Sequence, residues 1–166
     1  MSVLVIWYGL PGSGKSAQLR RLEDAGYRTF DDFMQDPLRL RSGIASSRHF
    51  DRILDAVRGA TPCAVADIQL CGQAFRDEMK AALTPQAPAL ALQWHCFDCR
   101  SAESVAICRD NVRFRAEHSD RNPRHALDWI DRCGADFTIE PGARLHAVVH
   151  ARLTACAPSP EAQGPS

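Results

Sequence analysis

The feature that most constrains the fold is a glycine-rich stretch near the start of the chain. Residues 9–16 read Gly-Leu-Pro-Gly-Ser-Gly-Lys-Ser and match the pattern G-x-x-x-x-G-K-[ST] at every position. The continuous apolar run at 3–8 is typical of a strand buried on both faces of a parallel sheet. The residues from Lys15 to Leu22 have a helical pattern that ends near Gly26. A strand, a glycine loop and a helix in this order predict a loop that binds phosphate groups.

The residue types in this loop suit that chemistry. Glycines allow backbone amides to wrap a phosphate group, and the helix that opens at Lys15 directs the positive end of its dipole at the same point. We expect Lys15 to bridge the β- and γ-phosphates of ATP and the Ser16 hydroxyl to bind Mg²⁺. The nucleotide-binding residues expected from the sequence are Gly9, Pro11, Gly12, Ser13, Gly14, Lys15, Ser16 and Ala17.

The rest of the chain alternates between strand and helix patterns. Strands are predicted at 27–30, 63–66 and 90–97, with a short last strand at 137–139. Helices are predicted at 47–58, 73–83 and 101–109, after Pro123, and after Pro141, where Leu145, Val148, Val149 and Leu153 share one helical face. This alternation predicts an α/β protein with a three-layer α/β/α fold and a roughly five-stranded parallel sheet.

Length and charge limit the alternatives. The chain has 166 residues with 20 basic and 20 acidic side chains, so its formal net charge is zero. This length predicts one domain, assigned to residues 1–156, and the Pro-, Ser- and Gly-rich tail at 157–166 is expected to be disordered. The balanced charge argues against a strongly basic nucleic-acid-binding protein.

Other composition features bear on location. No apolar run approaches the ~20 residues that span a bilayer, and the apolar start has no basic residue before it, so we expect neither a membrane segment nor a signal peptide. The seven cysteines are scattered and odd in number, which indicates reduced thiols and a cytoplasmic protein. No obligatory protein partner is evident.

Two aspartates follow predicted strands, and each has two interpretations. Asp31 comes at the end of the second strand, where open α/β sheets bind ligands, so it is either a proton acceptor or a solvated turn residue. Asp67 ends the third strand, where a carboxylate either holds Mg²⁺ through a water molecule or caps the strand. We expect Ser16 and Asp67 to be the metal site.

An arginine-rich segment follows the fourth strand. It contains Arg109, Arg113, Arg115, Arg121 and Arg124. These arginines belong either to a solvated helical face, with Asp110, Glu117 and Asp120 beside them, or to a helical lid at about 110–125 that closes on a triphosphate. Arg109 and Arg113 are four residues apart, so a helix would place them on one face.

These landmarks resemble the kinase domain of polynucleotide kinases. They are the phosphate loop, the Asp31-Asp32 pair, Asp67, the Phe97-Asp98 strand end and Arg109 with Arg113. The broader group of small P-loop kinases, including zeta-toxin-like and gluconate-kinase-like enzymes, is similar over residues 3–150. The resemblance implies that Asp31 is the general base and that Arg109 and Arg113 act on the triphosphate with Lys15.

The sequence departs from the polynucleotide kinases at two positions. Met34 replaces the arginine that commonly holds the acceptor's phosphate, and Ile68 replaces the usual hydroxyl residue after the third-strand aspartate. Both changes weaken the expectation of a nucleic-acid acceptor.

The sequence as a whole therefore predicts an ATP-dependent kinase. A GTPase would normally carry an N-K-x-D motif, and the chain has none. The expected reaction transfers the γ-phosphate of ATP to a hydroxyl of a small-molecule, nucleotide or polynucleotide acceptor. The alternative is a nucleotide-binding regulatory ATPase without a phosphoryl acceptor.

Overall fold

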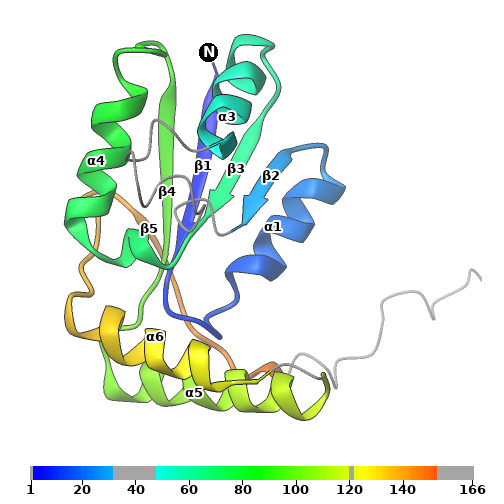
Figure 1. Ribbon diagram of the computed structural model, residues 1–166, viewed down its shortest axis with the longest axis vertical. Coiled ribbons are helices and arrows are strands. Elements are labelled where there is room, and N and C mark those ends of the chain that lie inside the picture. The colour runs from blue at the N-terminus through cyan, green and yellow to red at the C-terminus, as the bar shows by residue number, and fades with distance from the viewer. Residues whose placement is uncertain (1, 32–47, 120–121, 153–166) are drawn as a thin grey trace, which may run out of the picture.

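A parallel sheet of five strands forms the middle of the molecule (Figure 1). The structure, a computed structural model, describes residues 2–31, 48–119 and 122–152. The strands are β1 (Val3–Tyr8), β2 (Arg28–Asp31), β3 (Cys63–Ala66), β4 (Ala91–Phe97) and β5 (Arg144–His146), and their order in the sheet is β2-β3-β1-β4-β5. Every neighbouring pair is parallel. The α/β class and the five-stranded parallel sheet are confirmed.

β1 is the central strand, with β3 on one side and β4 on the other. All its side chains from Leu4 to Tyr8 are buried, because both faces of the sheet are covered. This explains why its apolar residues are consecutive rather than alternating. β1 leads directly into residues 9–16, so the glycine loop begins at the carboxyl edge of the sheet, where ligands bind in folds of this kind.

The helices flank the sheet and also cover its carboxyl edge. They are α1 (Lys15–Asp24), α3 (Arg48–Arg58), α4 (Gln73–Leu83), α5 (Ala102–Glu117) and α6 (Arg124–Ala135), with a short 3-10 helix η3 (Gln69–Cys71). Figure 1 shows α5 and α6 packed side by side across the end of the sheet to which the strand arrows point. Within the described segments, no helix is both long and apolar enough to span a bilayer.

The segment after α6 differs from the expectation. Residues 137–139 are not a strand of the sheet, and the residues after Pro141 do not form the predicted helix: the fifth strand begins at Arg144. Pro141 and Gly142 are the central residues of a β-turn, in which the Ala143 amide donates to the Glu140 carbonyl at 3.0 Å and Gly142 has a φ of +79°. A proline followed by a glycine in the left-handed region favours this turn over a helix start.

The apolar spacing that suggested a helix there is only partly used for burial, since Val148 is buried. Leu145 and Val149, two of the four residues assigned to one helical face, are half exposed at 50% and 53%. Leu153 lies outside the described residues. The helical spacing at 145–149 therefore does not mark one buried helical face. The three residues of β5 are those that pair with β4.

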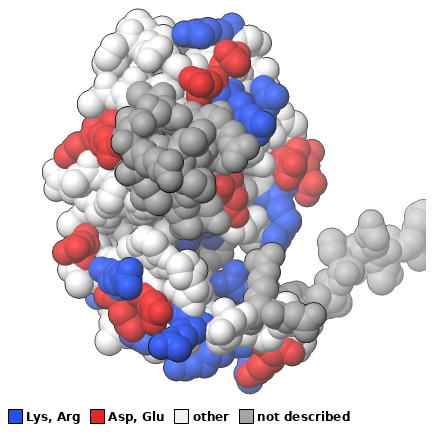
Figure 2. Space-filling view, in the orientation of Figure 1, with Lys and Arg blue, Asp and Glu red and all other residues white. Residues whose placement is uncertain are grey.

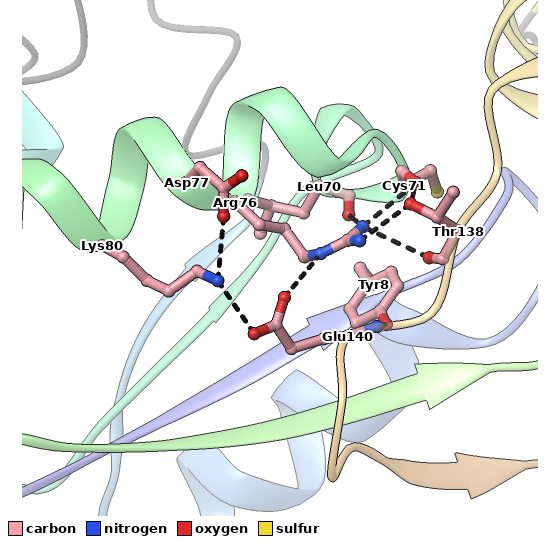
Figure 3. Close-up of polar contacts among 8 residues, drawn as sticks. All are labelled: Tyr8, Leu70, Cys71, Arg76, Asp77, Lys80, Thr138 and Glu140. Carbon is pink, nitrogen blue, oxygen red and sulfur yellow. Dashed lines mark hydrogen bonds and ion pairs between the residues drawn. The ribbon is translucent and has the colours of Figure 1, made fainter.

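A buried arginine joins α4 to the segment before the turn (Figure 3). Arg76 is 1% exposed, and its Nε donates to Glu140 Oε2 at 3.0 Å. Its Nη1 donates to the carbonyl oxygens of Leu70 and Cys71 at 2.7 and 3.1 Å. Glu140 also accepts from Lys80 Nζ at 2.9 Å. The charges compensate each other, so this network can lie in the core.

The same network holds the end of β1. The backbone amide of Glu140 donates to the Tyr8 hydroxyl at 2.7 Å, and Arg76 lies 5.3 Å from the centre of the Tyr8 ring. Burial raises the pKa of Tyr8 far above its usual value of 10. Since Tyr8 is the residue before Gly9, these contacts fix the point where the glycine loop begins.

We expect Glu140→Ala to lower the free energy of unfolding by about 3–5 kcal/mol, because Arg76 would keep a buried charge without its carboxylate. Urea denaturation of the purified protein measures this change. Asp77→Ala is the matched control: it removes the exposed carboxylate that contacts Lys80 at 2.9 Å and should cost far less. Equal losses in the two variants would contradict the role given to the buried network.

Three rings lie together on the face of the sheet opposite to Tyr8. Trp7 of β1 stacks on His95 of β4 with ring centres 4.4 Å apart, and His95 Nδ1 lies 3.0 Å from Nε2 of His146 on β5. Burial is the main reason why the pKa of His95 is about 4 instead of 6.5, and the charges of His146 and Arg144 lower it further. His95 is therefore neutral in the folded protein at neutral pH.

This pKa predicts acid sensitivity. Below about pH 6.5 the unfolded chain protonates His95, whereas the folded protein does so only near pH 4, so the free energy of unfolding should fall as the pH drops from 6.5 to 4. His95→Gln should reduce this loss by roughly 2 kcal/mol, measured by urea denaturation across that range. His125→Gln, at an exposed histidine of α6, is the control and should retain the wild-type slope. If the free energy of unfolding of His95→Gln fell with pH as steeply as that of the wild type, the acid sensitivity would not come from His95.

Candidate active site

Residues 9–16 form the loop between β1 and α1, as the motif predicts. Gly12 has a φ of +85°, and a Cβ at this position would lie 2.2 Å from the carbonyl oxygen of Cys108 in α5. No side chain fits in that space, so glycine is required here both for its backbone conformation and for the close approach of a second main chain. The loop is therefore enclosed on one side by α5.

Lys15 and Ser13 are the polar side chains buried in this loop. The Lys15 ammonium donates to the carbonyl oxygens of Gly9 and Leu10 at 2.7 and 3.1 Å, so it lies over the loop that carries it. The Ser13 hydroxyl is buried and has no hydrogen-bond partner among the described residues. A buried hydroxyl and a buried ammonium in one glycine loop are groups that an anion can satisfy.

The remaining loop residues expected to bind nucleotide lie where the motif places them. Pro11 and Gly14 are part of the loop, and Gly14 is the residue before the first turn of α1. Ala17 lies in the first turn of α1, and its amide donates to the Gly14 carbonyl at 3.1 Å. The Ala17 amide is thus engaged in the helix itself.

The carboxylates expected from the sequence lie on strands next to the loop. β3 is beside β1 and β2 is beside β3, so Asp31 and Asp67 both lie at the carboxyl edge of the sheet. The Ser16 hydroxyl donates to Asp31 Oδ2 at 2.7 Å. The structure therefore brings the expected metal ligand and the expected general base into direct contact.

Asp67 is fully buried after β3. Its Oδ1 accepts a hydrogen bond from the Gln69 amide at 2.7 Å, and its own amide donates to the Trp7 carbonyl at 3.4 Å. The strand-capping contact considered from the sequence is thus present. It fixes the orientation of a carboxylate one strand away from the start of the loop.

The expected lid is divided between two helices. Residues 110–117 are the second half of α5, and α6 begins at Arg124, so α5 already carries Arg109 and Arg113. Arg109 forms an ion pair with Asp131 of α6, and Arg113 contacts Asp110 at 3.3 Å on the surface. Both arginines are therefore paired with carboxylates of the helical layer. Arg121 and Asp120 lie outside the described residues.

Basic and acidic side chains are interleaved on this layer. In Figure 2, blue and red atoms lie next to one another over the lower part of the molecule, where Figure 1 places α5 and α6. Arg113 and Asp110 are both more than half exposed, and exposed pairs of this kind contribute little to stability. Their side chains can change partner at low cost.

Asn111 is a residue of the site that sequence reasoning missed. It is buried in α5, and its Nδ2 donates to the Gly12 carbonyl at 2.9 Å and to the Val149 carbonyl at 2.8 Å. It received no expected role from the sequence, because the expectation for this segment rests on its charged residues alone. The helical spacing of Cys108, Asn111 and Val112, all buried, is a local signal of the inner face, but it is weak beside the charged residues around it.

A cavity of about 380 Å³ lies beside this asparagine, between α5 and the chain after β5. Its lining consists of Asp110, Asn111, Arg113, Phe114, Glu117, His150 and Arg152. The Arg152 guanidinium is 5.3 Å from the centre of the Phe114 ring. One aromatic ring, two guanidinium groups and two carboxylates line this cavity, which Asn111 connects to the Gly12 carbonyl of the loop. A ring beside guanidinium groups can bind a flat aromatic ligand.

Comparison with known proteins bears on the fold. Neither protein-family models nor curated proteins match the sequence. Solved structures do match. A gluconokinase from Sinorhizobium meliloti 1021 superposes with a TM-score of 0.52 and 16% identity, over 92% of this chain and 85% of that chain. APE1195 superposes with a TM-score of 0.53 and 17% identity, over 89% of this chain and 85% of that chain.

A third similar structure is a chain of the Pnkp1/Rnl/Hen1 RNA repair complex, with a TM-score of 0.52 and 17% identity. It covers 86% of this chain, and this chain spans about half of its length, 48%. The protein has a P-loop kinase-like fold. The expected three-layer architecture is thus confirmed by the sheet order and by these neighbours, and at such low identity the likeness concerns the fold.

The anion chemistry of the loop can be tested without a nucleotide. We expect Lys15→Ala to weaken binding of tripolyphosphate at least about tenfold, because a charge-assisted hydrogen bond is lost. Isothermal titration calorimetry measures the affinity, and circular dichroism checks the fold. Arg20→Ala, which removes an exposed cation of α1, should bind as the wild type does. Wild-type affinity in Lys15→Ala would show that the anion does not bind in this loop.

Proposed function

We propose that the protein is an ATP- and Mg²⁺-dependent kinase that transfers the γ-phosphoryl group of ATP to a hydroxyl group. The observation that carries the proposal is the contact between Ser16 and Asp31 at 2.7 Å, at the mouth of a phosphate-type loop. This contact joins the residue that binds the metal in such loops to a carboxylate on the neighbouring side of the cleft. A carboxylate at this place can also accept the proton of an acceptor hydroxyl, which phosphoryl transfer to that hydroxyl requires.

The residues present fit a bound triphosphate. The unpaired Ser13 hydroxyl and the Lys15 ammonium lie within the loop, and both are groups that a phosphate can satisfy. The cavity beside Asn111 has the volume of a small-molecule site and contains the Phe114 ring and the Arg152 guanidinium, which suit a purine base. Ser16 and Asp67 would hold Mg²⁺, which when bound neutralises phosphate charge.

In the proposed mechanism, the chain's own groups position the reactants and move one proton. Lys15 leaves the loop carbonyls to bind the β- and γ-phosphates. Asp31 accepts the proton of the acceptor hydroxyl, whose oxygen forms a bond to the γ-phosphorus while the bond from that phosphorus to the oxygen of ADP breaks. Arg113, which is only weakly paired on the surface, turns to the triphosphate and stabilises the transferring group.

The acceptor side of the site is less defined than the nucleotide side. Met34, which stands at the position of the missing arginine, lies outside the described residues. Ile68, at the position of the usual hydroxyl residue, is buried in the core next to Asp67. One matched structure is a gluconokinase and another belongs to an RNA repair complex, so the acceptors to be tested include sugar acids, nucleosides and 5′-hydroxyl polynucleotides.

The test is a transfer assay with γ-labelled ATP and this panel of acceptors. We expect Asp31→Asn to reduce transfer by roughly 10²–10⁴-fold, because the proton acceptor is lost, with nucleotide affinity nearly unchanged. Asp24→Asn, at an exposed aspartate at the end of α1, is the matched control and should transfer as the wild type does. Hydrolysis of ATP that no acceptor accelerates, with equal rates in both variants, would favour a regulatory ATPase instead.

A further inference from the structure

Thiols gather around the phosphate loop, and the proposed function uses none of them. The Lys15 ammonium is close enough to interact electrostatically with the sulfurs of Cys71, Cys99, Cys108 and Cys133. These cysteines come from η3, the chain after β4, α5 and α6. The cysteines of the described segments are free thiols. Oxidation of a thiol in this cluster would therefore change the immediate surroundings of the loop.

Two of these thiols are in direct contact. The Sγ atoms of Cys99 and Cys108 are 3.9 Å apart, and the two residues are 2% and 0% exposed. The pair joins the end of the central sheet to α5, because Cys99 follows β4 and Cys108 lies within α5. The carbonyl of Cys108 is also the group that leaves no room for a Cβ on Gly12. The dithiol and the phosphate loop therefore share one residue of α5.

The two sulfurs differ in their readiness to ionise. A hydrogen bond from the Cys108 thiol lowers the pKa of Cys99, and the Leu10 amide and the Lys15 ammonium lower it further. The contact with Cys99 and burial raise the pKa of Cys108 far above its usual value. The thiolate is the form of cysteine that reacts with oxidants, so Cys99 is the sulfur that reacts first and Cys108 is the thiol that follows.

We propose that Cys99 and Cys108 form a dithiol that a hydroperoxide converts into a disulfide, and that this bond lowers the affinity of the phosphate loop for nucleotide. The Cys99 sulfur attacks one oxygen of hydrogen peroxide, the O–O bond breaks, and Cys99 becomes a sulfenic acid as one water forms. The Cys108 sulfur then attacks the Cys99 sulfur, and the hydroxyl leaves with the Cys108 proton as a second water. Two thiols are thus oxidised while one peroxide is reduced.

The effect on the loop follows from the contact at Gly12. Sulfur atoms 3.9 Å apart touch without being bonded, so bond formation brings Cys108 and the end of β4 closer together. The Cys108 carbonyl already lies against Gly12, so this turn of α5 cannot shift without changing the loop. Amides that no longer match a phosphate bind it less tightly. This step rests on the proposed function, because it requires a nucleotide in the loop.

Binding and oxidation should oppose each other. Both sulfurs are buried, so the oxidant reaches them when α5 and the loop separate, and a nucleotide that holds the loop in place slows this opening. The coupling is reciprocal: if the disulfide weakens binding of Mg·ATP tenfold, saturating Mg·ATP raises the reduction potential of the pair by about 30 mV. In cytosolic proteins, disulfides of this kind are transient and respond to oxidants.

The first experiment identifies the bond. Reduced full-length protein is freed of reductant, treated with hydrogen peroxide, alkylated and digested with trypsin without reduction. Cleavage after Lys80, Arg100 and Arg109 separates Cys99 in peptide 81–100 from Cys108 in peptide 101–109, so the disulfide joins two peptides that mass spectrometry detects together. Peptide 81–100 also contains Cys96. We expect Cys96→Ser to keep the joined peptides and Cys108→Ala to lose them.

The second experiment measures the affinity for Mg·ATP by calorimetry before and after peroxide treatment. We expect the oxidised wild type to bind about tenfold more weakly, the effect of one charge-assisted hydrogen bond, and dithiothreitol to restore the affinity. Cys99→Ser should keep its affinity after peroxide. Cys63→Ser, at a buried cysteine of β3, is the matched control and should respond as the wild type does. Circular dichroism checks the fold of each reduced variant, and wild-type protein with and without dithiothreitol provides the comparison that needs no variant.

The outcomes separate this inference from the proposed function. Peptides 81–100 and 101–109 that stay separate after peroxide would overturn it, and so would joined peptides with unchanged affinity for Mg·ATP. An equal loss of affinity in peroxide-treated Cys99→Ser would assign the effect to another group and overturn it as well. A reduced wild type that binds no nucleotide would refute the proposed function and with it the loss of affinity, whereas the peptides would still decide whether the disulfide forms.

Discussion

The main chains of the glycine loop and of α5 meet at Gly12. A Cβ at this position would lie 2.2 Å from the Cys108 carbonyl oxygen, and the Gly12 carbonyl accepts a hydrogen bond from Asn111. A contact between two backbones leaves little room for gradual adjustment, because packed interiors tolerate small displacements poorly. The loop, the arginine-bearing helix and the chain after β5 are therefore held as one unit. In the site as proposed, closure on a phosphate would involve arginine side chains more than a movement of the whole helix.

The opposite side of the site is held by a different kind of contact. Arg76 and Glu140 are buried together and connect α4 to the end of β1 through the Tyr8 hydroxyl. A buried ion pair contributes little net stability, since desolvation offsets the attraction, but removing one partner is costly. The Arg76–Glu140 pair therefore fixes how α4 is attached to the end of β1 more than it adds net stability. Parallel strand register then places Asp31 and Asp67 beside the loop that follows Tyr8.

Sequence reasoning predicted the parts of the fold that depend on local chemistry. The apolar run of β1, the glycine loop and the start of α1 are contiguous, so residues 3–24 carry their own structural signal. The strand-ending positions of Asp31 and Asp67 followed from short apolar segments. Their proximity to the loop followed from the rule that parallel strands end at one edge.

The rest depended on contacts between distant residues. Asn111 bonds to a residue 99 positions away and Arg76 to one 64 positions away, and neither polar side chain carries a local sign of burial strong enough to outweigh its charged neighbours. The pairing of Arg109 with Asp131 likewise requires the packing of α5 on α6. The turn at Pro141 and Gly142 did carry a local signal, which the apolar spacing after it obscured.

The central claim is that the backbone amides of residues 12–16 bind the phosphates of a nucleotide. Residue-resolved amide hydrogen exchange, with and without Mg·ATP, tests it most directly. The account predicts that exchange of these amides slows by about 100-fold at a ligand concentration 100 times the dissociation constant, if they exchange through a ligand-free state. Unchanged exchange in this loop under saturating nucleotide, or protection confined to another part of the chain, would contradict it.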